Sequence, residues 1–414
     1  MGHARDPGAT GGGAGRSRRV HGGSGGERVK RPLHPARLLA DLVRRPSLSG
    51  QEEALADWLG EELAGRPFAV ERVGNSLVCT LSRGAGPTLL CHSHLDTVAA
   101  GEGWTGDPHA GQWSAGRLVG LGANDAGASA VAMLCALESL AQADWFSGTL
   151  QVALCAEEET TNAGMGDVLA HLAARGCTPD GAICGEPTGL EVVRAQSGLA
   201  VLVAEWSGTS CHAARALAVA HENALLMAAR EVAGLPPVLV LPGEHELLGP
   251  STLVPAVFES GVAHNRVPDR ARLILDARLA PPHGAAECVQ ILRTWLPSAQ
   301  ITIRSQRLAA VETTEEHPLV LAALEAAAVA QAGSAGSSGS TDSMGTLCAV
   351  GSATMSDMAL VPEIPAVKCG PGLSERSHTP NEFVTATELE AGLAFYMRAM
   401  PAALTALTPE VAIP

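Results

Sequence analysis

The stretch Thr149-Leu-Gln-Val-Ala-Leu-Cys-Ala-Glu-Glu-Glu159 passes without a break from apolar residues into three carboxylates. A short apolar run such as 149–155 is typical of a strand buried inside a sheet. Carboxylates at the end of such a strand repel one another, and a cation or a shared proton has to offset that repulsion. A run of charges is more often a solvated surface, so an exposed acidic turn is the alternative. The apolar run directly before the carboxylates favours a charged site.

Other parts of the chain alternate between strand-like and helical patterns. Short apolar runs that read as buried strands occupy residues 76–81, 88–91 and 181–184. Apolar residues recur at helical spacing over residues 35–63, with a capped loop at 46–50, and over residues 126–141 and 165–174. Strands that alternate with helices predict an α/β domain with a central mixed sheet.

The pattern changes between residues 194 and 308. Strand-like segments at 199–206 and 271–279 alternate there with helical segments at 223–233 and 285–296. This strand–helix–strand–helix order predicts a smaller α+β domain inserted into the first domain.

The α/β pattern resumes with a helix at 318–332, a strand at 366–369 and a last helix at 386–400. The first domain is therefore expected to comprise residues 33–193 and 309–414. Two segments, 1–32 and 333–345, are rich in Gly, Ser or Arg and lack periodicity. They are predicted to be a disordered tail and a mobile surface loop.

The composition argues against several classes of protein. The formal net charge of −15 argues against nucleic-acid binding, because such a surface is basic. No apolar run reaches about 18 residues, so no membrane span is expected. The N-terminus lacks the apolar segment of a secretory signal, and the 10 cysteines include no CxxC pair. We therefore expect a protein of the reducing cytoplasm, without a structural zinc knuckle or a redox dithiol.

Further histidines and acids follow the predicted strands. His94 and Asp96 share one face after the second strand, Asp125 lies in a Gly-rich turn before a helix, and Glu186 and His378 follow two later strands. Ligands of open α/β sheets bind at these carboxyl ends. Each motif alone has a plainer interpretation, such as a solvated turn, a helix cap or a loop histidine. Together they form a nitrogen and oxygen donor set that suits zinc, cobalt or manganese, and one aspartate can bridge two such ions.

In the order of its motifs the chain resembles the co-catalytic zinc metallohydrolases of the aminoacylase and carboxypeptidase type. Within them it looks most like the branch of the acetylornithine deacetylases and succinyl-diaminopimelate desuccinylases. The resemblance covers about residues 34–400. The motifs are His94-x-Asp, Gly120-x-x-x-x-Asp, Glu157-Glu-Glu, Gly185-Glu-Pro-Thr and Ser377-His-Thr.

By position, the resemblance implies two divalent metal ions, zinc or cobalt, with manganese as a third option. His94, Asp125 and Glu186 would hold one ion. Asp125, Glu159 and His378 would hold the other, so that Asp125 bridges the two.

The resemblance also implies roles for three further side chains. Glu158 would be the general base, which takes a proton from a water and returns it to the leaving amine. Asp96 would orient the site. His212 would donate a hydrogen bond to the developing oxyanion in the active site of a partner subunit, which makes the protein a homodimer whose smaller domain is a lid and dimerisation domain. A solvated surface histidine is the alternative for His212.

Substrate contacts are predicted at three positions. Asn265 resembles an asparagine that contacts substrate in the family. Arg278 would pair with a substrate carboxylate, although an arginine at a strand end is as often part of a surface ion pair. Asp357 would meet a cationic end of the substrate, or it caps a helix.

The segments Lys368-Cys-Gly-Pro-Gly372 and Ser374–Thr379 look closest to those of acetylornithine deacetylases. The expected partner is therefore a small N-acyl amino acid, N-acetyl-L-ornithine in first place, as in arginine biosynthesis. Acetylcitrulline, succinyl-diaminopimelate and carrier-linked lysine stay open as alternatives, because they would differ only in pocket contacts. A catalytically inactive metal-binding protein on the same fold is the alternative of another class.

Overall fold

The computed structural model describes residues 30–334 and 348–408. The predicted tail and the predicted Gly/Ser loop lie almost wholly outside these residues. The first two residues of the predicted loop, 333 and 334, belong to helix α7 (Pro318–Ser334), which is therefore two residues longer than the helix predicted at 318–332.

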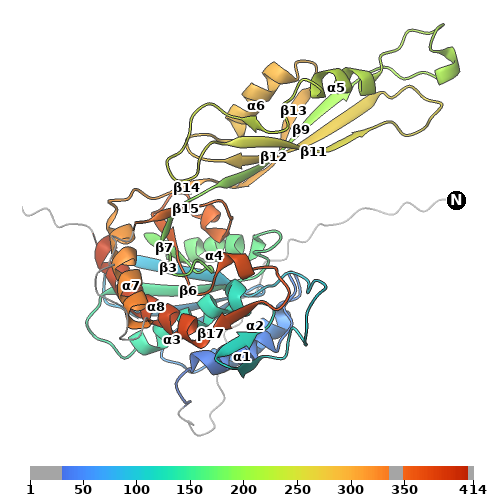
Figure 1. Ribbon diagram of the computed structural model, residues 1–414. Coiled ribbons are helices and arrows are strands. Elements are labelled where there is room, and N and C mark those ends of the chain that lie inside the picture. The colour runs from blue at the N-terminus through green and yellow to red at the C-terminus, as the bar shows by residue number, and fades with distance from the viewer. Residues whose placement is uncertain (1–29, 335–347, 409–414) are drawn as a thin grey trace, which may run out of the picture.

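Among the described residues, nine strands form one mixed sheet, which is the larger of the two main sheets in Figure 1. Its order is β1-β2-β6-β3-β7-β16-β8-β14, and β15 pairs with β8. Strand β3 runs parallel to its neighbours β6 and β7, and β16 runs parallel to β7. The carboxyl ends of these four strands therefore share one edge of the sheet. The strands are β1 (Ala69–Val73), β2 (Ser76–Arg83), β3 (Thr88–His94), β6 (Gly148–Cys155), β7 (Gly181–Cys184), β8 (Val193–Gln196), β14 (Val311–Glu312), β15 (Val350–Ser352) and β16 (Ala366–Lys368).

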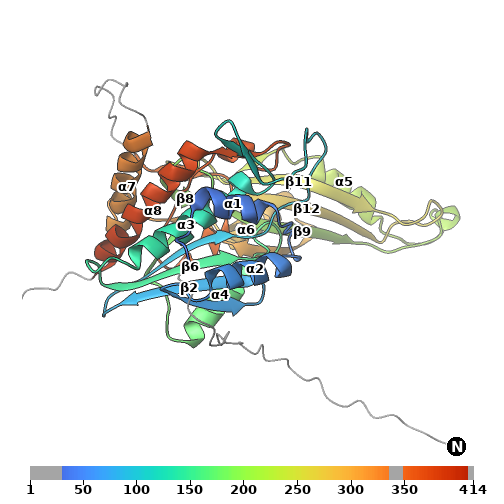
Figure 2. The same ribbon diagram turned by 90° about the horizontal axis from the view of Figure 1, so that it is seen from below.

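Helices cover both faces of this sheet, which explains why its central strands read as continuous apolar runs. Leu89 and Cys91 of β3 belong to the core beneath α3 and α8, whereas Leu90 between them belongs to the core beneath α4. Figure 2 shows α7, α8 and α3 as one layer against the sheet. The helices are α1 (Pro35–Val43), α2 (Glu53–Leu63), α3 (Ala128–Leu140), α4 (Ala163–Ala174), α7 and α8 (Ala386–Leu407). The loop at 46–50 is present, but Glu52 is the N-cap of α2 and makes no side-chain cap bond.

A small sheet of three strands joins two distant parts of the chain. Strand β5 (Arg117–Val119) pairs with both β4 (Gln112–Ser114) and β17 (Phe383–Thr385). Because β17 lies five residues after His378 and β5 lies six residues before Asp125, this pairing brings those two segments together.

A separate sheet of five strands carries its own core and projects from the large sheet in Figure 1. Its order is β10-β11-β12-β9-β13, and α5 and α6 pack on one face. The two predicted strands and two predicted helices are present as β9, β12, α5 and α6, but β10, β11 and β13 were not predicted. The elements are β9 (Gly198–Ser207), α5 (Ala224–Val232), β10 (Leu239–Val240), β11 (Thr252–Ser260), β12 (Arg270–Leu279), α6 (Ala285–Trp295) and β13 (Gln300–Leu308).

The chain enters and leaves the five-stranded sheet by neighbouring strands. Strand β8 precedes β9, β14 follows β13, and β8 and β14 pair antiparallel in the large sheet. The predicted fold class, an α/β domain with a central mixed sheet and an inserted smaller α+β domain, is confirmed. The residue boundaries of the two predicted domains stay a prediction. Within residues 30–334 and 348–408, no helix is long and apolar enough to cross a membrane.

Candidate metal centre

The predicted ligands lie at the edge where the parallel strands of the large sheet end. His94 is the last residue of β3, Glu159 lies four residues after β6, and Glu186 lies two residues after β7. His378 reaches the same edge from a loop that follows β16 and a short 3₁₀ helix at Ser374–Arg376. Four segments of the chain therefore converge at the place where α/β sheets bind ligands.

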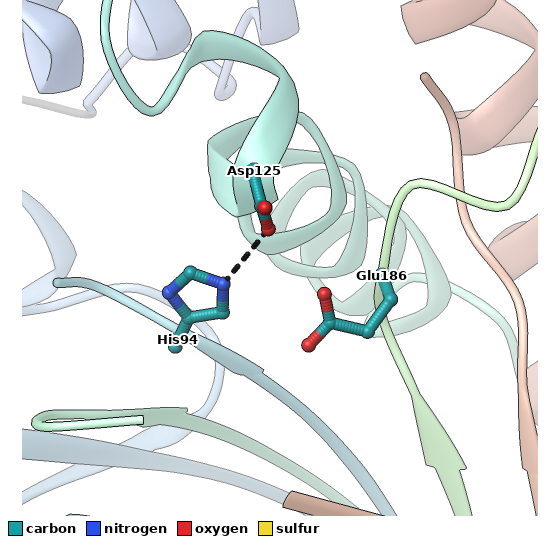
Figure 3. A group of neighbouring side chains, drawn as sticks. All are labelled: His94, Asp125 and Glu186. Atoms are coloured by element: carbon teal, nitrogen blue, oxygen red, sulfur yellow. Dashed lines mark hydrogen bonds and ion pairs between the residues drawn. The ribbon is translucent and has the colours of Figure 1, made fainter. Parts of the chain in front are cut away.

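Among the described residues, three sets of three side chains have the geometry of a metal site, and two of them are the predicted ligand sets. Ligand atoms of His94, Asp125 and Glu186 lie within 4.8 Å of one another, and Figure 3 shows the three side chains facing a common point. Ligand atoms of Asp125, Glu159 and His378 also lie within 4.8 Å of one another. Asp125 is common to both sets, as a bridge between two cations requires.

The short contacts within these sets run through Asp125 and Glu159. Asp125 Oδ1 lies 3.2 Å from His94 Nε2, and Asp125 Oδ2 lies 3.7 Å from His378 Nε2. His378 Nε2 also lies 2.8 Å from Glu159 Oε1. This hydrogen bond to Glu159 raises the pKa of His378 to about 9.

Glu158 lies between the two sets and lines the same cavity, which has a volume of about 430 Å³. Its carboxylate also comes within 4.8 Å of ligand atoms of His94 and Glu159. Burial raises the pKa of Glu158 well above its usual range, and Glu186 and Asp357 raise it further against the opposing charge of His94. A carboxyl group with a raised pKa and an open cavity before it suits a general base.

Asp96 contacts the backbone of the loop that carries Glu158 and Glu159, and it also lies close to His94. Its carboxylate accepts hydrogen bonds from the backbone N–H of Glu158 at 3.0 Å and of Glu159 at 3.1 Å, and from Ser49 Oγ at 2.6 Å. His94 Nδ1 lies 3.6 Å from Asp96 Oδ1. With 1 % of its surface exposed, Asp96 is positioned to orient the site rather than to touch a substrate.

The turn that carries Asp125 is held by Glu382, a residue that was not singled out in the sequence. The buried carboxylate of Glu382 accepts hydrogen bonds from the backbone N–H groups of Asn124 at 2.8 Å, Asp125 at 2.9 Å and Gly122 at 3.3 Å. Burial raises the pKa of Glu382 to about 7 although these N–H groups oppose the shift. Asp125 is not a helix cap, because Gly127 occupies the N-cap position of α3.

The donor set fits divalent cations. Four carboxylates, those of Asp125, Glu158, Glu159 and Glu186, line one cavity. In the described part of the chain no Lys or Arg forms an ion pair with any of them. Burial raises the pKa of Glu186 to about 8, and the carboxylates of Asp125 and Glu159 add to this shift against His94 and Lys368. Oxygen and nitrogen donors around such a concentration of negative charge suit zinc, cobalt or manganese.

His212 and Asn265 lie together but away from this cavity. His212 follows β9, Asn265 lies between β11 and β12, and the backbone carbonyl of Asn265 accepts a hydrogen bond from Ala213 at 2.9 Å. Both residues are exposed, and neither lines the cavity of its own chain. The structure therefore brings them together without bringing them to the predicted ligands.

Neither Arg278 nor Asp357 lines the cavity. Arg278 pairs with Asp276 at 2.7 Å and approaches the sulfur of Met355, which lines the cavity, at 3.8 Å. Asp357 is 2 % exposed and is not among the lining residues. The capping alternative for Asp357 is wrong, because Ser356 caps the 3₁₀ helix at Asp357–Leu360.

Two further side chains at the site were missed in the sequence. Asn162 donates hydrogen bonds to the backbone carbonyl of Glu158 and to Asp357 Oδ1, both at 3.0 Å. It belongs to none of the motifs that were recognised in the sequence. Lys368 lines the cavity at the end of β16, where burial lowers its pKa and the carboxylate of Glu186 opposes that shift. The sequence could have drawn attention to Lys368, because it contains only two lysines.

Comparisons with known proteins point to one family. A profile of the family described as Peptidase family M20/M25/M40 matches residues 90–402. Succinyl-diaminopimelate desuccinylase from Wolinella succinogenes is 35 % identical over 157 residues, which are 37 % of this chain and 42 % of the relative. Acetylornithine deacetylase from Proteus mirabilis is 34 % identical over 176 residues, which are 39 % of this chain and 44 % of the relative. The chain thus spans less than half the length of these two relatives.

Solved structures share the fold over most of the chain. A metallo-carboxypeptidase of the M20 family from Sulfolobus solfataricus superimposes with a TM-score of 0.68 at 19 % identity, covering 90 % of this chain and 99 % of that chain. A dinuclear metal-binding peptidase of the M20 family from Bacillus subtilis superimposes with a TM-score of 0.65 at 19 % identity, covering 91 % and 98 %.

Proposed function

Since the chain belongs to the peptidase family M20/M25/M40, we propose that it is a metallohydrolase that cleaves the amide of an N-acyl amino acid at a site with two divalent metal ions. The observation that carries this proposal is the shared position of Asp125 between two sets of ligand atoms, each within 4.8 Å. The description of the Bacillus subtilis structure as a dinuclear metal-binding peptidase supports it.

Each of these side chains has a separate role in the proposed hydrolysis. Divalent cations held by these side chains would lower the pKa of a water and polarise the amide carbonyl. Glu158 accepts a proton from the attacking water and returns it to the leaving amine. Asp96 keeps Glu158 in place through the hydrogen bond from the Glu158 backbone N–H.

We further propose that His212 acts in the active site of a second copy of the chain. His212 is exposed and lies outside the cavity of its own chain, so a donor role there requires another molecule. In that position its imidazole would donate a hydrogen bond to the carbonyl oxygen as negative charge develops on it. Asn265 would approach the substrate from the same copy, because it lies beside His212.

N-acetyl-L-ornithine is our first substrate proposal. Its support is the 34 % identity to acetylornithine deacetylase. Two exposed carboxylates on the lining of the cavity, Glu191 and Glu375, offer a counter-charge for the cationic side chain of ornithine. Asp357 is a poorer counter-charge, because it is 2 % exposed and does not line the cavity.

Succinyl-diaminopimelate is the second substrate candidate. It is favoured by the 35 % identity to succinyl-diaminopimelate desuccinylase and by the cationic Lys368 on the wall of the cavity. A succinyl group ends in a carboxylate, whereas an acetyl group does not.

The experiment that tests the proposal measures the release of ornithine from N-acetyl-L-ornithine. The protein is stripped of metal with a chelator and reloaded with zinc or cobalt, and Glu158→Ala serves as the variant without the base. We expect turnover that depends on metal and falls by at least about a hundredfold in the variant.

Two results would count against it. Turnover that is independent of metal, or equal in Glu158→Ala, refutes the reaction class. Release of diaminopimelate from its succinyl derivative in the absence of ornithine release would replace the first substrate by the second.

A further inference from the structure

Lys368 is an unusual side chain for its position. The chain has only two lysines, and this one is 2 % exposed. Strand β16 places it between β7 and β8, where it pairs with Cys184 on one side and Val193 on the other. Burying an ammonium group is costly, so a lysine in such a place needs partners that compensate for lost water.

Its partners are polar groups on the wall of the cavity. Lys368 Nζ donates hydrogen bonds to Ser352 Oγ at 3.0 Å, to the backbone carbonyl of Thr354 at 3.0 Å and to Thr354 Oγ1 at 3.2 Å. Three acceptors match the three hydrogens of a charged ammonium group, whereas a neutral amine has two. The ammonium group of Lys368 is therefore hydrogen-bonded to Ser352 and Thr354, which both line the cavity.

The two hydroxyl groups can present a donor to a ligand. Ser352 Oγ and Thr354 Oγ1 lie 2.7 Å apart, and either can donate to the other. Ser352 Oγ can also donate to the backbone carbonyl of Thr354 at 3.2 Å. When it donates to Thr354 Oγ1 instead, the hydrogen of the Thr354 hydroxyl has no acceptor among the described residues. Thr354 is exposed and lines the cavity, so this hydrogen is available to an acceptor that enters. The ammonium group behind it would strengthen that hydrogen bond.

The charges around the cavity favour an anionic acceptor at this point. Lys368 is the only Lys or Arg among the described residues that line the cavity, and the remainder of the lining carries six carboxylates. Arg278 approaches Met355 of the lining, but its guanidinium is already paired with Asp276. A carboxylate of a substrate would meet favourable charge here and unfavourable charge along the rest of the lining.

We propose that Lys368, Ser352 and Thr354 form a subsite that binds a carboxylate of the substrate. This proposal rests on the proposed hydrolysis of an N-acyl amino acid and adds what the cavity recognises in it. The carboxylate has two possible sources, the α-carboxylate of the amino acid or the end of an acidic acyl group. Both offer the same chemistry to Thr354 and Lys368.

Three ligands separate the two sources. N-acetyl-L-ornithinamide carries no carboxylate, N-acetyl-L-ornithine carries one on the amino acid, and N-succinyl-L-ornithinamide carries one on the acyl group. Their binding is measured by calorimetry to the zinc-loaded full chain with Glu158→Gln, so that no turnover is needed. The same measurement is repeated with Lys368→Met added.

We expect one of the two carboxylate ligands to bind about tenfold to a hundredfold more tightly than the amide ligand. Lys368→Met should remove most of that preference and change binding of N-acetyl-L-ornithinamide less than threefold. Lys30→Met is the matched control, because the other lysine is exposed and donates to backbone carbonyls of α2. It should leave all three affinities unchanged.

A second variant and a spectroscopic measurement do not depend on the stability of Lys368→Met. Thr354→Val, at an exposed position, should weaken the same ligand about threefold to tenfold. With ¹³C at lysine Cε, the full chain gives two lysine signals, and Lys30→Met identifies them. The Lys368 signal should shift with the favoured carboxylate ligand and not with the amide ligand.

The outcomes separate this proposal from the reaction. Equal losses for all three ligands in Lys368→Met, no preference in the parent protein, or an unchanged Lys368 signal would overturn the subsite. If the zinc-loaded wild-type chain hydrolyses neither N-acetyl-L-ornithine nor succinyl-diaminopimelate while the binding preference is intact, the reaction is overturned and the subsite remains. If none of the three ligands binds, both proposals fail.

Discussion

The carboxylate of Glu382 accepts a hydrogen bond from the backbone N–H of Asp125 at 2.9 Å. The shared predicted ligand is therefore fixed through its main chain as well as its side chain. Glu382 lies in the segment between His378 and β17, so the same stretch of chain supplies one predicted ligand and positions another.

Substituting Glu382 should weaken metal binding. Glu382→Ala leaves the N–H groups of Gly122, Asn124 and Asp125 without their acceptor, which frees the turn. We expect the zinc affinity, measured by competition with a chelating dye, to fall about tenfold to a hundredfold. Glu388→Ala is the control, because Glu388 caps α8 and pairs with Arg376 without touching the turn. An unchanged zinc affinity in Glu382→Ala would contradict the positioning role.

The stability of the metal-free protein should depend on pH through His378. The hydrogen bond to Glu159 raises the pKa of His378 to about 9, above its ordinary value of 6.5. A raised pKa means that the folded state binds the proton more tightly, so the contribution is complete below pH 6.5 and disappears as pH rises through about 9. The imidazole is 51 % exposed, so we expect less than about 1 kcal/mol.

Urea unfolding of the metal-free wild type and of His378→Gln tests this pH dependence. The difference in unfolding free energy between the two should be largest near pH 6 and should vanish near pH 10. A difference that grows with rising pH would contradict it. Zinc must displace the same proton, so zinc affinity of the wild type should increase with pH below about 9 more steeply than that of the variant.

Asn162 links the five-stranded sheet to the loop of Glu158. Its amide donates to the Glu158 carbonyl at 3.0 Å and accepts a hydrogen bond from Arg307 Nε of β13 at 3.1 Å. Asn162 has a φ of 55°, which glycine also adopts, so Asn162→Gly removes the amide without backbone strain. We expect kcat to fall about tenfold with unchanged metal content and little change in KM.

Arg307→Ala should lower kcat in the same direction by a smaller factor, because the amide of Asn162 keeps its bond to Glu158. Arg304→Ala is the matched control, since Arg304 is an exposed arginine on the same strand. Equal kcat values for Arg307→Ala and Arg304→Ala would show that β13 does not influence the Glu158 loop.

Gly370 leaves room for the backbone behind Glu186. A Cβ atom at Gly370 would lie 2.6 Å from the carbonyl oxygen of Glu186 and 2.9 Å from the hydroxyl of Tyr396. Gly370→Ala should therefore lower the free energy of unfolding by about 1–3 kcal/mol. Gly166→Ala, in α4 with nothing within 4 Å, should instead raise it by about 0.5–1 kcal/mol. Urea unfolding of both variants decides whether the close approach matters.

The large sheet could be predicted because its central strands are buried on both faces. Residues 149–155 and 181–184 stood out as apolar runs, and β6 and β7 occupy nearly the same positions. Strands β11 and β13 could not be found in this way. Pro255 interrupts the apolar residues of β11, and Val257 and Phe258 of that strand are more than 40 % exposed. Most of β13 is exposed, and residues 304–307 of this strand are all polar.

The candidate site was predictable where chemistry coincides with a strand end. His94, Glu159 and Glu186 each follow a recognisable strand, and the structure gathers them within a few ångströms. Glu382 and Asn162 act through backbone groups that belong to other segments, and such contacts leave no local pattern. The roles of Glu382 and Asn162 could be recognised only from the pairing of β17 with β5 and from the packing of η5 (Asp357–Leu360) against α4.

The order of the elements has a consequence for biosynthesis. Strand β16 lies between β7 and β8, yet it is made after the whole five-stranded sheet. On the ribosome, His94 and Glu186 emerge long before His378, and at ordinary translation rates the remaining chain takes roughly 10–50 s. During that time β7 and β8 lack the strand that lies between them in the folded sheet. The ligand set of Asp125, Glu159 and His378 can therefore form only after the segment with His378 has been synthesised, whereas His94, Asp125 and Glu186 are present earlier.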